Sequence, residues 1–194
     1  MPRAHGTQRL EARRARLERH AAESDPGVVL SAAARFLELR SRSVQEVRRH
    51  LTSARYPEPL VQSAIARLIE LGMLDDGAFA RAWVESRDRV RPRGAQALRR
   101  ELTLKGIDRE VVAQVLSDRD GAAAELADRE PGEVSADEVT AERLLGKNRA
   151  MLGRVADPRV RRQRAYALLA RNGFDPEVCR EVSARFTSAE AQDD

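Results

Sequence analysis

The chain has 194 residues, room for one ordinary domain or several small ones, and its hydrophobic content of 42% is enough for packed cores. Because 34% of the residues are charged and only 4% are aromatic, these cores should be thin and much of the surface solvated. The net charge of +4 and the pI of about 9.9 favour an acidic partner such as nucleic acid, and no apolar run approaches the roughly 18 residues of a membrane helix.

Residues 1–26 form a basic N-terminal arm. Leu10 and Leu17 are its only large apolar residues after Met1, which is too few to anchor a helix face, and no apolar stretch of a signal peptide is present. We therefore expect a mobile tail or a frayed helix. Binding of this arm to the phosphate backbone of a nucleic acid is the alternative. Its arginines outnumber its acidic residues: Arg3, Arg9, Arg13, Arg14, Arg16 and Arg19 against Glu11, Glu18, Glu23 and Asp25.

A first three-helix repeat is predicted over residues 27–73. Its short first helix begins near Ser31 and carries Phe36, Leu37 and Leu39. Ser43, with Glu46 three residues later, is a capping box that opens the second helix. Residues 56–59 break the pattern. The third helix follows with apolar residues at helical spacing and stops at Gly72: Leu60, Ala64, Ile65, Leu68 and Leu71.

A second repeat is predicted over residues 74–117. Asp75 and Asp76 could suggest a metal or acid–base pair, but capping of the following helix explains them more simply. Phe79 and Trp83 should be the large core residues of that helix. The second helix is basic, with Leu98 and Leu102 on one face; Gly106 ends it and Asp108 caps the third helix, which should bury Val111, Val112, Val115 and Leu116.

Residues 118–137 form a predicted acidic linker, in which carboxylates outnumber Arg119 and Arg129. A third repeat follows over 138–187, with one long first helix up to Val155 and an Asp157–Pro158 start to the second. Cys179 corresponds to Val112, so a small buried core residue is favoured over a nucleophile. Residues 188–194 form an acidic tail.

The same pattern of helix and turn residues occurs three times in the sequence. Residues 42–51 align without a gap with 93–102, and residues 163–175 align with 96–108. The predicted fold class is therefore all-α, with about nine helices in three tandem three-helix, helix-turn-helix-like repeats that pack into an elongated, curved body.

Catalytic chemistry is not indicated by the residues. His5 and His20 lie in the arm and His50 stands alone, so no catalytic or metal-ligand cluster can be drawn, and we expect a non-enzymatic binding protein without a cofactor. In DNA-reading helix-turn-helix proteins the third helix enters the groove by its N-terminus. Here those N-termini carry carboxylates, at Glu58, Asp108 and Asp175, so a basic surface laid along an acidic partner is favoured.

The central residues resemble the signature of the RecX regulatory proteins. The resemblance rests on residues 71–76, 79–87, 93–102 and 105–108, is supported by residues 41–47 and 169–174, and covers roughly residues 32–186. Two features differ from the family pattern: Arg55 stands where the family usually has glycine, and the acidic stretch after Ser117 is longer. The resemblance implies a cytoplasmic protein that binds the groove of the RecA–DNA filament. It implies inhibition of strand exchange, ATP hydrolysis and co-protease function, and hence roles in homologous recombination, DNA repair and the SOS response.

Basic residues of the second and third repeats are the predicted partner-binding site, for a monomer that meets DNA weakly, without sequence preference and mainly within the filament. A direct DNA-binding protein or transcriptional repressor is the alternative, and a scaffold for another helical partner is a further one. The predicted binding residues are Arg81, Arg87, Arg89, Arg91, Arg93, Arg99, Arg100, Lys105, Arg161, Arg162 and Arg164.

Overall fold

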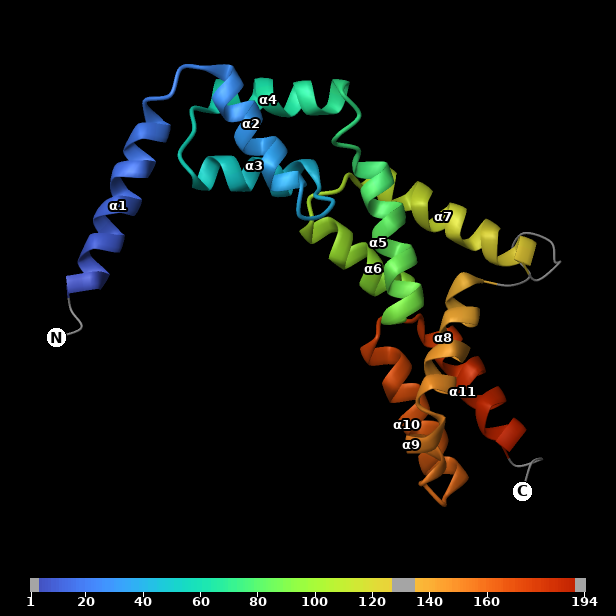
Figure 1. The fold of residues 1–194 in the computed structure, drawn as a ribbon. Helices are drawn as coiled ribbons and strands as arrows, with labels where there is room; N and C mark the ends of the chain where they lie inside the picture. The colour runs from blue at the N-terminus through green and yellow to red at the C-terminus, as the bar shows by residue number, and fades with distance from the viewer. Residues whose placement is uncertain (1–3, 127–134, 191–194) are drawn as a thin grey trace. The chain divides into compact units, whose positions relative to one another are not determined.

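The computed structural model describes residues 4–126 and 135–190, and this part of the chain consists of helices and connecting turns without a strand (Figure 1). The all-α repeat fold is thereby confirmed. The helices are α1 (Ala4–Ala21), α2 (Pro26–Leu37), α3 (Val44–Ser53), α4 (Glu58–Glu70), α5 (Asp76–Val90), α6 (Ala95–Leu104), α7 (Arg109–Leu126), α8 (Ala136–Lys147), α9 (Arg149–Gly153), α10 (Pro158–Arg171) and α11 (Pro176–Glu190).

Two compact units make up the chain. The N-terminal unit holds the residues up to Phe79 together with Lys105–Ile107, and the C-terminal unit holds Ala80–Leu104 and the residues from Asp108 onward. The predicted elongated, curved body and the predicted domain boundaries both stay predictions.

In the N-terminal unit, α2, α3 and α4 pack around one core. Helix α2 begins at Pro26, earlier than the expected start near Ser31, because Asp25 caps it and proline suits a first helical position. Val29 and Ala33 on this helix are buried in the core. Leu39 was expected in this helix but follows its end and is 83% exposed. The larger core residues are Val47, Leu51, Val61, Ile65, Leu68 and Leu74.

The capping box of α3 is confirmed. Ser43 Oγ accepts a hydrogen bond from Glu46 N at 3.1 Å, and Ser43 N donates to the Glu46 carboxylate at 3.3 Å. Helix α1 corrects the expectation of an unanchored arm, since Leu17 and His20 in its last two turns are partly buried. These two residues anchor α1, which the small number of apolar residues in the arm did not lead us to expect.

In the C-terminal unit, α8, α10 and α11 enclose a core that includes Leu145, Leu169, Phe174 and Cys179. The burial of Cys179 confirms its predicted place in the core. Burial raises the pKa of its thiol to about 11, with Asp175 and Asp137 adding to the effect.

Several predicted helix ends and one predicted core position in this unit are wrong. Helix α7 continues to Leu126, through the first half of the expected linker, because Ala122–Ala124 are good helix formers and Ala124 is buried. The rest of that linker up to residue 134 lies outside the described residues. The expected single long helix of the third repeat divides at Asn148 into α8 and α9. Trp83 is only partly buried, and Ala80 and Val84 fill the core instead.

Candidate functional site

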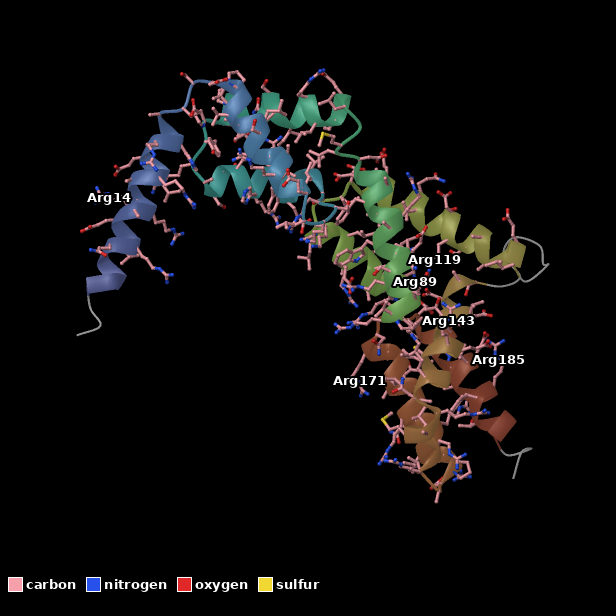
Figure 2. The ribbon with its side chains drawn as sticks, viewed as in Figure 1. Arg14, Arg89, Arg119, Arg143, Arg171 and Arg185 are labelled. Atoms are coloured by element: carbon pink, nitrogen blue, oxygen red, sulfur yellow. The ribbon has the colours of Figure 1, made fainter. Side chains whose placement is uncertain are left out.

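The predicted binding residues lie on four stretches of chain: α5, the connection between α5 and α6, α6 with the turn after it, and α10. The side-chain view shows basic groups over these elements, with Arg89 labelled near the end of α5 (Figure 2). The structure divides them into residues with intramolecular partners and residues that point into solvent.

Glu101 holds two of the predicted arginines. Its Oε2 accepts hydrogen bonds from Arg87 Nε at 2.7 Å and from Trp83 Nε1 at 2.8 Å. The Arg87 guanidinium also lies 4.3 Å from the centre of the Trp83 ring. Arg93 Nε is 3.6 Å from Glu101 Oε1, and Arg93 Nη1 donates to Asn172 Oδ1 at 2.9 Å. These side chains join α5, α6 and the end of α10 inside the C-terminal unit.

Lys105 and Arg161 are also engaged within the protein. Lys105 Nζ lies 2.6 Å from Glu46 Oε1 in the N-terminal unit. Burial alone would raise the pKa of Glu46, but hydrogen bonds from Arg40, Lys105 and Ser43 N outweigh it and lower that pKa to about 2. Arg161 Nε donates to the carbonyl oxygen of Val155 at 3.0 Å.

The other predicted residues are exposed. Within the described ranges none of their guanidinium groups makes an ion pair, so each is available to an anionic partner. Leu98 and Leu102 share one face of α6 and are fully buried, so Arg99 and Arg100, which lie on other faces of the helix, point away from the core. The exposed residues are Arg81, Arg89, Arg91, Arg99, Arg100, Arg162 and Arg164.

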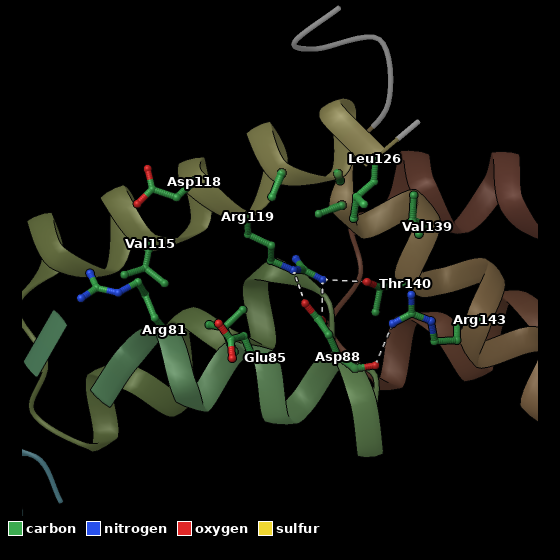
Figure 3. Close-up of a pocket in the computed structure, with 14 residues that line it drawn as sticks. Arg81, Glu85, Asp88, Val115, Asp118, Arg119, Leu126, Val139, Thr140 and Arg143 are labelled. Atoms are coloured by element: carbon green, nitrogen blue, oxygen red, sulfur yellow. Dashed lines mark hydrogen bonds and ion pairs between the residues drawn. The ribbon is translucent and has the colours of Figure 1, made fainter. Parts of the chain in front are cut away.

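Sequence reasoning missed Arg119, whose side chain is only 7% exposed. Its guanidinium donates to both carboxylate oxygens of Asp88 at 2.9 Å and to Thr140 Oγ1 at 3.0 Å (Figure 3). It also donates to Asp137 Oδ1 at 2.6 Å. It therefore joins α5, α7 and α8. A signal existed in the sequence, because Arg119 follows Val112 and Val115 at helical spacing and so lies on the apolar stripe of α7.

Arg119 also lines a groove of about 460 Å³ between α5, α7 and α8 (Figure 3). Apolar side chains, among them Val115 and Val139, share its walls with Arg81 and Arg143. Arg143 Nη1 donates to the carbonyl oxygen of Asp88 at 3.1 Å. Acidic and basic groups both border the groove, so it does not favour a partner of one charge.

The paired aspartates have structural partners. Asp75 Oδ1 accepts a hydrogen bond from Ala78 N at 2.9 Å, which is the expected cap, whereas Asp76 Oδ1 accepts from Val44 N at 2.9 Å. His50 stacks on Phe36 at 3.9 Å. Burial, together with nearby Arg42 and Arg16, lowers the pKa of His50. Among the described residues no group of three or more His, Cys, Asp or Glu side chains could hold a metal ion.

Carboxylates cap the third helices of the second and third repeats, α7 and α11, as predicted. Asp108 Oδ1 accepts a hydrogen bond from Glu110 N, and Asp175 Oδ1 accepts one from Glu177 N. The N-termini of α7 and α11 therefore present carboxylates. No helix in the described part of the chain has the length and apolar character needed to cross a bilayer.

Comparisons with known proteins identify relatives of this chain. Residues 30–68 match the family profile described as RecX, first three-helix domain, and residues 75–116 match RecX, second three-helix domain. The "Regulatory protein RecX" of Mycobacterium sp. (strain JLS) is 35% identical over 149 residues, 76% of this chain and 75% of the relative. That of Chlorobium phaeobacteroides (strain BS1) is 31% identical over 161 residues, 83% of this chain and 95% of the relative.

Solved structures share the fold. A crystal structure of RecX from Lactobacillus salivarius superposes with a TM-score of 0.63 at 20% identity, covering 82% of this chain and 95% of that one. A second crystal structure, of a regulatory protein RecX, gives a TM-score of 0.65 at 19% identity, covering 82% of this chain and 71% of that one.

Proposed function

The chain belongs to the RecX family of regulatory proteins, and from this premise we propose that it binds the RecA–DNA filament in its groove and inhibits recombinase activity. The inhibited activities would be strand exchange, ATP hydrolysis and co-protease function. The proposal needs no catalytic group, because the protein acts by occupying a surface of the polymer.

The observation that carries the proposal is the set of exposed arginines on two separate parts of the C-terminal unit. Arg99 and Arg100 project from α6, and Arg162 and Arg164 project from α10, without an ion pair among the described residues. Guanidinium groups bind phosphate or carboxylate with two parallel hydrogen bonds, so both DNA and acidic protein surfaces are suitable partners. Several weak contacts on one polymer also reinforce one another without a deep pocket.

A direct, sequence-specific DNA reader is less well supported. The helices that would enter the major groove start at Asp108 and Asp175, and these caps carry negative charge toward an approaching phosphate backbone. A mobility-shift assay with competitor DNA separates the two functions. Weak, salt-sensitive and sequence-blind binding agrees with the filament proposal, and a preferred duplex sequence would favour a transcriptional repressor.

The direct test measures RecA's DNA-dependent ATPase in the presence of this protein. Wild-type chain should inhibit it, and the charge reversal Arg99→Glu with Arg100→Glu should raise the half-inhibiting concentration by about tenfold or more. Arg35→Glu with Arg67→Glu makes the same change of charge at exposed positions of α2 and α4, so it should leave inhibition near wild type. Equal inhibition by both double variants would refute the site assignment, and no inhibition by the wild-type chain would refute the function.

A further inference from the structure

A glycine turn in the N-terminal unit docks against the start of a helix. The turn is Lys105–Ile107, and Ser43 Oγ at the start of α3 donates a hydrogen bond to the Lys105 carbonyl at 2.7 Å. Gly106 has a φ of +79°, and a Cβ built on it would lie 2.4 Å from the Cβ of Gln45. Contact this close requires glycine.

The C-terminal unit repeats this arrangement. Gly94 N, at the position that aligns with Ser43, donates to the Asn172 carbonyl at 3.0 Å. Gly173 has a φ of +80°, and a Cβ there would lie 2.4 Å from the Cβ of Ala97. In both turns, therefore, the carbonyl before a left-handed glycine accepts a hydrogen bond from the start of the preceding repeat's second helix.

The first repeat contains a third turn of the same kind, Ala54–Tyr56. Arg55 has a φ of +66°, the left-handed conformation of the two glycines. Each of the two glycine turns is preceded in the sequence by a complete repeat. The Ala54–Tyr56 turn belongs to the first repeat, so α1 takes the place of the preceding repeat. Nδ1 of His20, in the last turn of α1, lies 3.0 Å from the Ala54 carbonyl. The imidazole also stacks on Tyr56 at 4.2 Å and 14°.

We propose that Ala54–Tyr56 is a docking surface equivalent to the two glycine turns and that α1 is its occupant, closing the start of the repeat series. The connection after α1 supports this, because the Glu23 carboxylate accepts hydrogen bonds from Ser24 N and Asp25 N at 2.9 Å each, which holds a fixed corner. Leu17, partly buried, borders a shallow groove together with Arg55.

The side chain of Arg55 distinguishes this surface from the other two. A Cβ in either glycine turn would overlap the partner helix, so a helix that approaches as closely as α3 or α6 cannot dock at Arg55. His20 reaches the carbonyl by its imidazole, and its helix backbone need not approach as closely. The Arg55 side chain thus leaves room for α1 but excludes the second helix of a repeat from another copy of this protein.

Hydrogen exchange of the full-length protein, measured by mass spectrometry, tests the proposal. With His20→Ala, the amides of residues 8–21 should exchange about tenfold faster, while those of α10 keep their wild-type rates. Alanine is a better helix former than histidine, so an α1 stabilised only by its own sequence would exchange more slowly in this variant. The two explanations therefore predict changes of opposite sign.

The matched control is Arg9→Ala, because Arg9 is exposed on the same helix and does not line the shallow groove beside Arg55. It should leave the exchange of residues 8–21 within about twofold of wild type. The proposal is overturned if His20→Ala leaves this segment unchanged or slows it, or if the wild-type segment already exchanges at the rate of an unprotected peptide.

Discussion

Glu46 gives the N-terminal unit a defined dependence on pH. Its carboxylate accepts hydrogen bonds from Arg40, Lys105 and Ser43 N, and its pKa falls to about 2 although burial opposes the change. Since the folded-state pKa lies below the unfolded value of about 4.3, the stabilisation is complete above that value and is lost as the pH falls toward 2. This stabilisation amounts to about 2 kcal/mol. That is less than the free energy equivalent to the whole change in the pKa of Glu46, because the carboxylate is partly hydrated.

We predict that Glu46→Gln lowers the free energy of unfolding by about 2 kcal/mol at pH 7 and by much less at pH 2.5. Urea denaturation at both pH values measures the difference. Glu70→Gln is the control, because the Glu70 side chain is 64% exposed and should change little at either pH. A loss for Glu46→Gln that does not depend on pH would show that packing, and not ionisation, explains its effect.

Arg119 is a residue whose removal should damage the C-terminal unit. Burial alone would lower its pKa, but Asp88 and Asp137 raise it, so the group stays charged. We predict that Arg119→Met costs about 3 kcal/mol of unfolding free energy, because the buried carboxylate of Asp137 loses its cationic partner and keeps only the hydrogen bonds from Ala95 N. The measurement is urea denaturation, with Arg185→Met, 53% exposed, as the control that should change stability by less than about 0.5 kcal/mol.

At the scale of elements, the start of α6 depends on the absence of a side chain at Gly94. A Cβ there would lie 2.3 Å from the Gly173 carbonyl oxygen and 2.4 Å from the Phe174 Cα, and both neighbours are backbone atoms that cannot rotate away. Gly94→Ala should therefore separate α6 from the turn before α11 and cost about 2 kcal/mol.

Thermal unfolding followed by circular dichroism measures this cost. Gly121→Ala is the matched control, since a Cβ at Gly121, inside α7, meets no atom within 4 Å. Alanine there should raise stability by about 0.5–1 kcal/mol through helix propensity. If Gly94→Ala also proved stabilising, the close contact at the start of α6 would be wrong.

Most helices could be predicted because their signals are local. The Ser43–Glu46 capping box and the glycine stops at Gly72 and Gly106 are short sequence patterns, and the structure has each of them. The extension of α7 was missed because acidic composition suggested a linker, whereas helix formation there depends on alanines and on burial of Ala124. Arg55 adopts the conformation of the glycine that it replaces, and the sequence alone does not show that an arginine will accept it.

At the scale of the whole molecule, the sequence identified basic segments but not the partners that neutralise some of them. Glu101 lies within the basic helix α6, yet it binds Arg87 of α5, and Glu46 binds Lys105 across 59 positions of sequence. Such pairings follow from tertiary packing, so a count of charges overestimates the cations open to a partner. The predicted set therefore divides into structural cations and exposed ones.

This division predicts how salt should affect binding to the RecA–DNA filament. Each phosphate contact that is lost reduces the slope of log K against log salt by about 0.7–0.9. Arg99→Gln with Arg100→Gln removes two exposed cations, so the slope should become shallower by about 1.4–1.8 if both contact phosphate. Fluorescence anisotropy with labelled filaments between about 50 and 200 mM salt measures the slope.

Arg87→Gln provides the comparison, because its guanidinium is engaged with Glu101 and Trp83. It should lower the free energy of unfolding by about 1–2 kcal/mol and leave the salt slope of the folded protein unchanged. If Arg87→Gln instead flattened the slope and the Arg99 and Arg100 substitutions did not, the partner would select Arg87 over the exposed arginines. Glu101 would then act as a placeholder for a phosphate, which a partner must displace before it can bind.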